Sequence, residues 1–196
     1  MEALLKADEA VGLWLNGWVG HFPALDAVVR LTVSDYFIPA VISLLMIGLW
    51  FTGADAVDRN RRQRGVIRAM MAMGLANLVV LVINQHYFRF RPFVEHDIAL
   101  LFYRPTDSSF PANPAAISFA MASGIFQGDK RAGVAAFALA ALWAISRAYA
   151  GVFYPLDVLG GAGIGLAVSY TVKWWLWSME PAPSFVLGIF RRLHLA

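Results

Sequence analysis

Apolar residues form long, nearly uncharged blocks along this chain, and they do not recur at the spacing of a half-buried helix or strand. A helix that crosses a bilayer needs about 20 mostly apolar residues. Five blocks approach that length and are predicted as spans: Tyr36–Ala54, Ala69–Gln85, Ser109–Gly128, Ala132–Ile145 and Val158–Val172. The pattern predicts an all-α fold, a polytopic transmembrane helical bundle of five to six spans, the sixth depending on the N-terminal segment.

Polar side chains interrupt the first 35 residues, which therefore predict an interfacial segment rather than a clear span. Between Pro23 and Val33 one helical face is mostly apolar, and it consists of Leu25, Val28, Val29 and Thr32. Asp26 and Arg30 fall on the opposite face, as in a helix that lies in the membrane interface or packs flat against the bundle. We expect one integral-membrane domain, 1–196, made of an N-terminal interfacial segment 1–35, a transmembrane core 36–178 and a cytoplasmic tail 179–196.

Composition supports a membrane protein and excludes several kinds of site. Hydrophobic residues make up 59% of the chain and charged residues 15%, whereas soluble domains are usually about 25% charged. The absence of cysteine excludes disulfides, thiolate metal sites and a cysteine nucleophile. The net charge of +3 comes from arginines beside apolar spans, so no nucleic-acid partner is expected. The run Glu95-His96-Asp97 lacks the single-face spacing of a metal site, and neither a metal nor another cofactor is expected.

The positions of the charges predict how the chain is threaded. Asp55–Arg68 contains five arginines, which marks it as cytoplasmic by the positive-inside rule. Threading forward from it places 87–108 outside, 127–131 inside and Arg147–Asp157 outside. Arg91, the Pro111 segment and Arg147–Asp157 therefore share the outer face of the membrane. Three distant segments on one face can converge into a common site.

Three short motifs lie in these outer segments. The first runs from Asn84 through six residues to Arg91-Pro92, and the second is Ser109-Phe-Pro-Ala-Asn-Pro-Ala. The third is Ser146-Arg147, five residues, Phe153, three residues and Asp157. In order and spacing they resemble the three signatures of the type 2 phosphatidic acid phosphatase family, most strongly over 84–161. The span pattern is similar to that of small undecaprenyl-diphosphate phosphatases of this family, which implies a bacterial cytoplasmic membrane and a site on its extracytoplasmic side.

The resemblance implies which chemistry these positions would carry. In the family, the histidine of the third signature attacks phosphorus and the aspartate orients it, while the histidine of the second signature protonates the leaving oxygen. This chain has Phe153 at the nucleophile position and Pro114 at the acid position, so no catalytic residue is predicted. Loss of such groups usually costs many orders of magnitude in rate.

Residues that hold phosphate in the family are partly retained. Arginine suits phosphate because its guanidinium offers paired donors. The predicted phosphate-binding residues are Arg91, Arg147, Ser146, Asn84 and Asn113, with Asn84 at the position of the family's lysine. Asp157 has no histidine to orient and is expected to be an ion-pair partner beside Arg147. Arg104 is interpreted as an interfacial anchor.

The sequence therefore predicts a catalytically degenerate member of this family with an arginine-lined pocket in the outer leaflet. It would bind a phosphorylated lipid or act as an accessory subunit of a membrane complex, and it would not be an enzyme of the family mechanism. Membrane lipids, partner membrane proteins or a second copy of the chain are the expected partners. Two alternatives stay open: an active lipid phosphatase with chemistry relocated to His86 or His96, and a lipid-phosphate transporter.

Overall fold

The computed structural model describes residues 2–180 and residue 188, and within these residues all regular structure is helical. The elements are α1 (Glu2–Asn16), α2 (Pro23–Thr32), α3 (Phe37–Phe51), α4 (Ala56–His86), α5 (Pro92–Glu95), α6 (Asn113–Gly128), α7 (Lys130–Tyr149) and α8 (Pro155–Ser178). The predicted all-α class is confirmed. Most of the predicted cytoplasmic tail lies outside the described residues.

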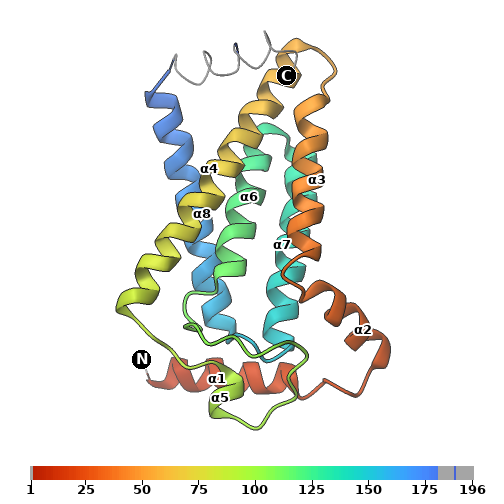
Figure 1. Cartoon of the computed structure of the whole chain (residues 1–196), viewed down its shortest axis with the longest axis vertical. Coiled ribbons are helices and arrows are strands. Elements are labelled where there is room, and N and C mark those ends of the chain that lie inside the picture. Colours follow the sequence, from red (N-terminus) through yellow and green to blue (C-terminus); the bar gives the residue numbers. More distant parts are fainter. Residues whose placement is uncertain (1, 181–187, 189–196) are drawn as a thin grey trace.

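Five helices, α3, α4, α6, α7 and α8, run along the long axis, while α1 lies across one end beside α5 (Figure 1). The central helix is α6, which packs against α4, α7 and α8. Glycine permits the close contact with α8, because a Cβ on Gly161 would overlap the carbonyl oxygen of Ala112 and one on Gly165 that of Ala116. Backbones can approach closely where such small residues meet.

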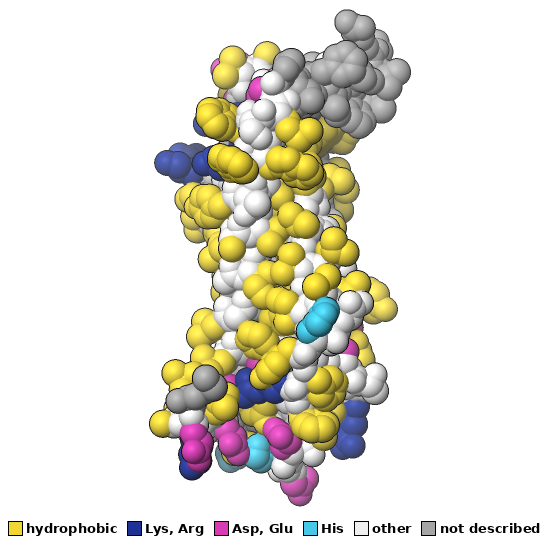
Figure 2. All heavy atoms as spheres, turned by 90° about the vertical axis from the view of Figure 1, so that its left-hand side faces the viewer, with side chains coloured by type: hydrophobic (Ala, Val, Ile, Leu, Met, Phe, Trp, Pro, Cys, Tyr) yellow, Lys and Arg dark blue, Asp and Glu magenta, His cyan; other side chains and the backbone are white. Residues whose placement is uncertain are grey.

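The surface has the polarity of a membrane protein. Hydrophobic side chains cover most of the middle of the face in Figure 2, and charged side chains gather toward its two ends. By length and composition α4, α7 and α8 can each cross a membrane, and α2 with α3 forms a further candidate bent by 57°. The helices α3 and α6 are 15 and 16 residues long, too short to qualify singly. Three or four candidate spans result, so five to six spans stays a prediction.

The arginine-rich segment predicted to be cytoplasmic is helical. It forms the first turns of α4, whose start is capped by the Asp55 carboxylate accepting from the Asp58 N–H at 2.7 Å. The 31 residues of α4 extend about 46 Å at 1.5 Å per residue. That length exceeds the roughly 30 Å of bilayer hydrocarbon, so its charged first turns can project beyond the membrane.

The buried face of α2 differs from the predicted one. Val29 and Thr32 are buried as expected, but Leu25 and Val28 are 42% and 51% exposed. Asp26, predicted on the polar outer face, is buried and accepts a hydrogen bond from the Tyr149 hydroxyl at 2.9 Å. The prediction was wrong because α2 packs against the polar end of α7, where a carboxylate finds donors.

The N-terminal helix α1 also buries polar positions and exposes apolar ones. Its buried residues are Asp8, Gly12 and Asn16. Trp14 is 63% exposed, and Leu4, Leu5 and Val11 are also exposed. The Asn16 side chain fixes α1 to the bundle, because it donates to the carbonyl oxygens of Ala99 (2.8 Å) and Tyr149 (3.0 Å). The predicted interfacial position of this segment stays a prediction.

Candidate functional site

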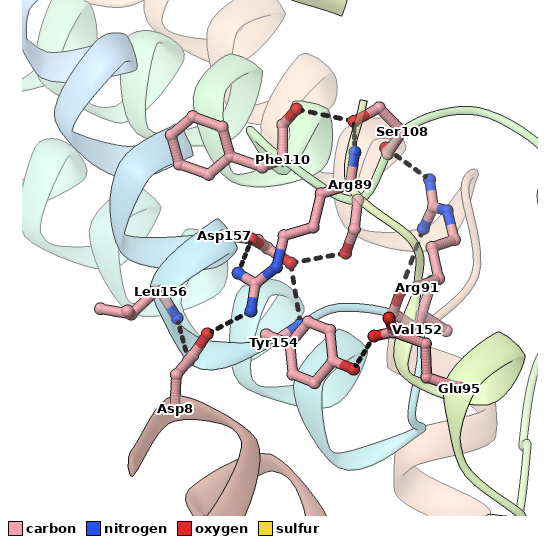
Figure 3. A network of polar contacts seen from close by, with 11 residues as sticks. Asp8, Arg89, Arg91, Glu95, Ser108, Phe110, Val152, Tyr154, Leu156 and Asp157 are labelled. Atoms are coloured by element: carbon pink, nitrogen blue, oxygen red, sulfur yellow. Dashed lines mark hydrogen bonds and ion pairs between the residues drawn. The ribbon is translucent and has the colours of Figure 1, made fainter. Parts of the chain in front are cut away.

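Arg89 connects three distant segments at the end of the bundle that α1 covers (Figure 3). Its Nη1 donates to Asp157 Oδ1 at 2.5 Å, and its Nη2 donates to Asp8 Oδ2 at 2.8 Å. The guanidinium also lies 4.2 Å from the centre of the Tyr154 ring, a cation–π contact. Burial lowers the pKa of Arg89, but the two carboxylates outweigh it, so the pKa is raised overall.

Sequence analysis did not single out Arg89 or Asp8. Arg89 is one of the six residues between Asn84 and Arg91 in the first motif, two positions before Arg91. The motif does not specify a residue type there, so it did not mark Arg89 as functional. Asp8 lies 81 positions from Arg89 in the chain. Its Oδ1 accepts from the Leu156 N–H at 2.7 Å, in the first turn of α8, where a negative charge is favourable.

Asp157 is fully buried in the first turn of α8. Its Oδ2 accepts from the Ser109 hydroxyl at 2.5 Å and from the Tyr154 N–H at 3.1 Å. The structure thus places Asp157 in an ion pair, but its partner is Arg89 rather than the neighbouring Arg147. Protein donors surround both carboxylate oxygens, as a buried charge requires.

Arg91 is buried, with 3% of its surface exposed. Its Nε and Nη2 donate to the backbone oxygen and Oδ1 of Asp107 at 3.1 and 2.9 Å, and its Nη1 donates to the Val152 oxygen at 3.1 Å. The guanidinium lies 4.2 Å from the centre of the Phe153 ring. Burial lowers the pKa of Arg91, and Asp107 opposes that effect.

Arg147 is equally buried at the end of α7. Its Nη2 forms an ion pair with Asp35, and its guanidinium lies 4.3 Å from the centre of the Phe102 ring. Arg91 and Arg147 both contact Val152: Arg91 Nη1 donates to the Val152 carbonyl oxygen at 3.1 Å, and the Val152 N–H donates to the Arg147 carbonyl oxygen at 3.0 Å. The two predicted phosphate-binding arginines are therefore brought together, and each already has an acidic partner.

The other predicted phosphate ligands point elsewhere. The Ser146 hydroxyl lies 2.6 Å from the Thr32 hydroxyl of α2. Asn113, at the start of α6, donates to Asn77 Oδ1 at 2.9 Å. Among the described residues, the buried Oδ1 atoms of Asn84 and Asn113 have no hydrogen-bond donor. Hydrogen bonding does not join these three predicted ligands to the arginines.

At the two positions where the resembled family has catalytic histidines, this chain has side chains that cannot transfer a proton. Phe153 is buried beneath Arg91, and Pro114 lies in the first turn of α6. The two histidines considered as replacements have other partners: His86 Nδ1 lies 2.9 Å from the Val82 oxygen, and His96 Nε2 lies 3.1 Å from Glu9 Oε1. Within the described part of the chain, no group of three acidic or histidine side chains is arranged to hold a metal.

Comparison with known proteins identifies relatives of this chain. The family model of the PAP2 superfamily matches residues 65–180. The chain is 24% identical over 180 residues to the undecaprenyl-diphosphatase BcrC of Bacillus subtilis, covering 91% of this chain and 89% of the relative. It is 30% identical over 137 residues to the putative undecaprenyl-diphosphatase YbjG of Escherichia coli, covering 68% of this chain and 67% of that one.

Two solved structures share the fold. LpxE of Aquifex aeolicus superposes with a TM-score of 0.66 at 26% identity, over 84% of this chain and 93% of that one. A transmembrane PAP2-type phosphatidylglycerolphosphate phosphatase from Bacillus subtilis superposes with a TM-score of 0.65 at 24% identity. That match covers 92% of this chain and 90% of that protein.

Proposed function

This chain belongs to the PAP2 superfamily of membrane proteins, and from that premise we propose that it binds a phosphorylated lipid without hydrolysing it. The observation that carries the proposal is the position of Phe153. The side chain at the nucleophile position is a buried ring beneath Arg91, and a benzyl group can neither attack phosphorus nor transfer a proton. The binding arginines are kept while the reacting group is lost.

The environment of Asp157 supports the same proposal. A carboxylate that orients a catalytic histidine needs an acceptor oxygen directed at the ring nitrogen. Here Arg89, Ser109 and the Tyr154 N–H are bound to the two oxygens of Asp157. The remnant of the catalytic centre has become part of a buried ion-pair network, which is a structural role.

The arginines of the site supply the binding chemistry. The Val152 carbonyl oxygen and the Phe153 ring hold the Arg91 guanidinium, and the Asp35 carboxylate and the Phe102 ring hold that of Arg147. Guanidinium groups bind phosphate oxygens through charge-assisted hydrogen bonds. We place this site on the extracytoplasmic side of a bacterial cytoplasmic membrane. The arginine-rich start of α4 supports that orientation, because it lies at the opposite end of the bundle (Figure 1).

Phosphate release and lipid binding, measured on the same purified full-length protein, test the proposal. Undecaprenyl diphosphate and phosphatidic acid are the probes, and BcrC of Bacillus subtilis is the active control. We expect lipid-phosphate binding by native mass spectrometry and no phosphate release above background. Arg147→Lys keeps the charge but loses the planar fork, and it should weaken binding about tenfold. Phosphate release at a rate near that of the control would overturn the proposal.

An active phosphatase is the second candidate, and the relatives named undecaprenyl-diphosphatases favour it. His96 is the best-placed base for relocated chemistry, because Glu9 lies 3.1 Å from its Nε2 at the same end of the bundle. If this mechanism operates, replacing both His86 and His96 by alanine abolishes turnover. Unchanged turnover in the double variant would exclude it.

Two other roles use the same site. An accessory subunit would retain a stable protein partner during gentle purification, and native mass spectrometry distinguishes that partner from a bound lipid. A transporter would move lipid phosphate in proteoliposomes, and flux that survives loss of Arg91 and Arg147 would exclude transport through these arginines.

A further inference from the structure

A groove of about 470 Å³ opens in front of Arg91 at the α1-covered end of the protein. One side is aromatic: Phe88 and Phe90 are 56% and 55% exposed, and their rings meet edge to face at 5.3 Å. The other side is polar and contains Arg104 and Asp107. The groove is therefore amphipathic, with a buried guanidinium in its wall.

The two sides of the groove are held together by backbone contacts. The Arg89 N–H donates to the Ser108 hydroxyl at 3.1 Å, and the Ser109 N–H donates to the Arg89 oxygen at 2.9 Å. These bonds tie the segment that carries Phe88 and Phe90 to the segment that ends at Asp107. The groove is a built feature of the fold rather than a gap between two independent loops.

Arg104 is a free cation at this groove. It is exposed, and among the residues that the structure describes it has no hydrogen-bond or ion-pair partner. The sequence alone suggested an interfacial anchor for this residue, but its place in the groove wall gives it a second use. A free guanidinium beside exposed aromatic rings suits the phosphate end of an amphiphile.

The Asp107 carboxylate binds the Arg91 guanidinium where a phosphate would bind, so it competes with phosphate for this arginine. Its Oδ1 lies 2.9 Å from Arg91 Nη2, yet its side chain is 60% exposed. An ion pair with so exposed a carboxylate is weak, whereas the carbonyl oxygen of Val152 keeps the guanidinium in place from the buried side. A phosphate oxygen can therefore take the place of the carboxylate without moving Arg91.

We propose that this groove receives the phosphate end and the first hydrocarbon units of the lipid, with Arg104 as a direct ligand and Asp107 as the group that phosphate displaces. The inference rests on the proposed lipid-phosphate binding and names where and how it occurs. It adds Arg104, Phe88 and Phe90 to the site. It also predicts that Asp107 weakens binding of the lipid phosphate, whereas the arginines strengthen it.

The test is isothermal titration of the full-length protein in nanodiscs with farnesyl phosphate, farnesol and inorganic phosphate. Farnesyl phosphate should bind more tightly than either other probe, because only it uses both sides of the groove. Arg104→Gln should weaken its binding about tenfold, the loss of one charge-assisted contact. Asp107→Asn should strengthen it about threefold, since a weak exposed competitor is removed.

Arg30→Gln is the matched control, because Arg30 is also an exposed arginine without a partner among the described residues, on α2 and away from the groove. It should leave affinity unchanged. If Arg104→Gln binds as tightly as Arg30→Gln while Arg147→Lys, whose side chain does not line the groove, loses binding, the groove assignment is wrong and the proposed function stands. Weaker binding by Asp107→Asn, or equal binding of inorganic phosphate and farnesyl phosphate, also overturns the assignment. No binding by the unaltered protein refutes the proposed function itself.

Discussion

The guanidinium of Arg91 lies 4.2 Å from the centre of the Phe153 ring, and both side chains are buried. An arginine expected to hold phosphate is thus stacked on the residue that stands at the nucleophile position. The ring stabilises the cation from one face, while the Val152 oxygen and Asp107 bind it at its edge. The phenylalanine at this position therefore supports the arginine.

Restoring the histidine alone should not restore hydrolysis. In Phe153→His the new imidazole meets an Asp157 whose oxygens are bound to Arg89 and Ser109, so it is not oriented as a base. Pro114 also leaves no acid for the departing oxygen. We expect phosphate release from undecaprenyl diphosphate to stay at background in Phe153→His and in Phe153→His/Pro114→His. Turnover in either variant would show that Asp157 is free to orient a histidine.

Breaking the buried ion pair of Arg89 should destabilise the protein strongly. Asp157→Asn removes a buried charge and leaves part of the Arg89 guanidinium unbalanced, which typically costs about 3–5 kcal/mol. Arg89→Gln should cost a similar amount, and the double variant should cost less than the sum of the two. Thermal unfolding in detergent measures this coupling. Additive losses in the double variant would contradict a direct interaction.

Asn16 should hold α1 against the bundle. Asn16→Ala leaves the carbonyl oxygens of Ala99 and Tyr149 without their donor, and an unsatisfied buried polar group costs about 1–3 kcal/mol. Amide hydrogen exchange in α1 should rise while exchange in α6 is unchanged. Glu2→Gln is the control, since its ion pair with Lys6 is exposed. A similar rise in both variants would mean that α1 frays independently of Asn16.

The contact between α6 and α8 should tolerate a methyl group at one glycine and not at another. Gly161→Ala places a Cβ against the Ala112 carbonyl, whereas a Cβ on Gly163 meets nothing within 4 Å. We expect Gly161→Ala to destabilise the protein by about 1–3 kcal/mol through overpacking. Gly163→Ala should be neutral or slightly stabilising, because alanine favours a helix over glycine. Equal unfolding temperatures for the two variants would refute this packing.

The helices were largely predictable from the sequence, because long apolar blocks have few alternatives in a bilayer. Their exact lengths were not. The predicted span began at Ala69, whereas α4 begins at Ala56, because arginine marks cytoplasmic segments but is also a good helix former. In α2 the apolar pattern selected the wrong face, since the donor on Tyr149 that Asp26 meets is contributed by a distant helix.

The sequence by itself determined the family and the helical class, and it placed Phe153 and Pro114 where the family resemblance has histidines, because these depend on residue types at fixed spacings along the chain. It also indicated that Arg91, Arg147 and Asp157 would meet, since alternating spans return their loops to the same end of a bundle. Only the tertiary structure decided which charges pair. Arg89 with Asp8 and Asp157, Arg91 with Asp107, and Arg147 with Asp35 are contacts between residues distant in the chain. No local pattern encodes such partners, because they depend on how whole helices and loops pack.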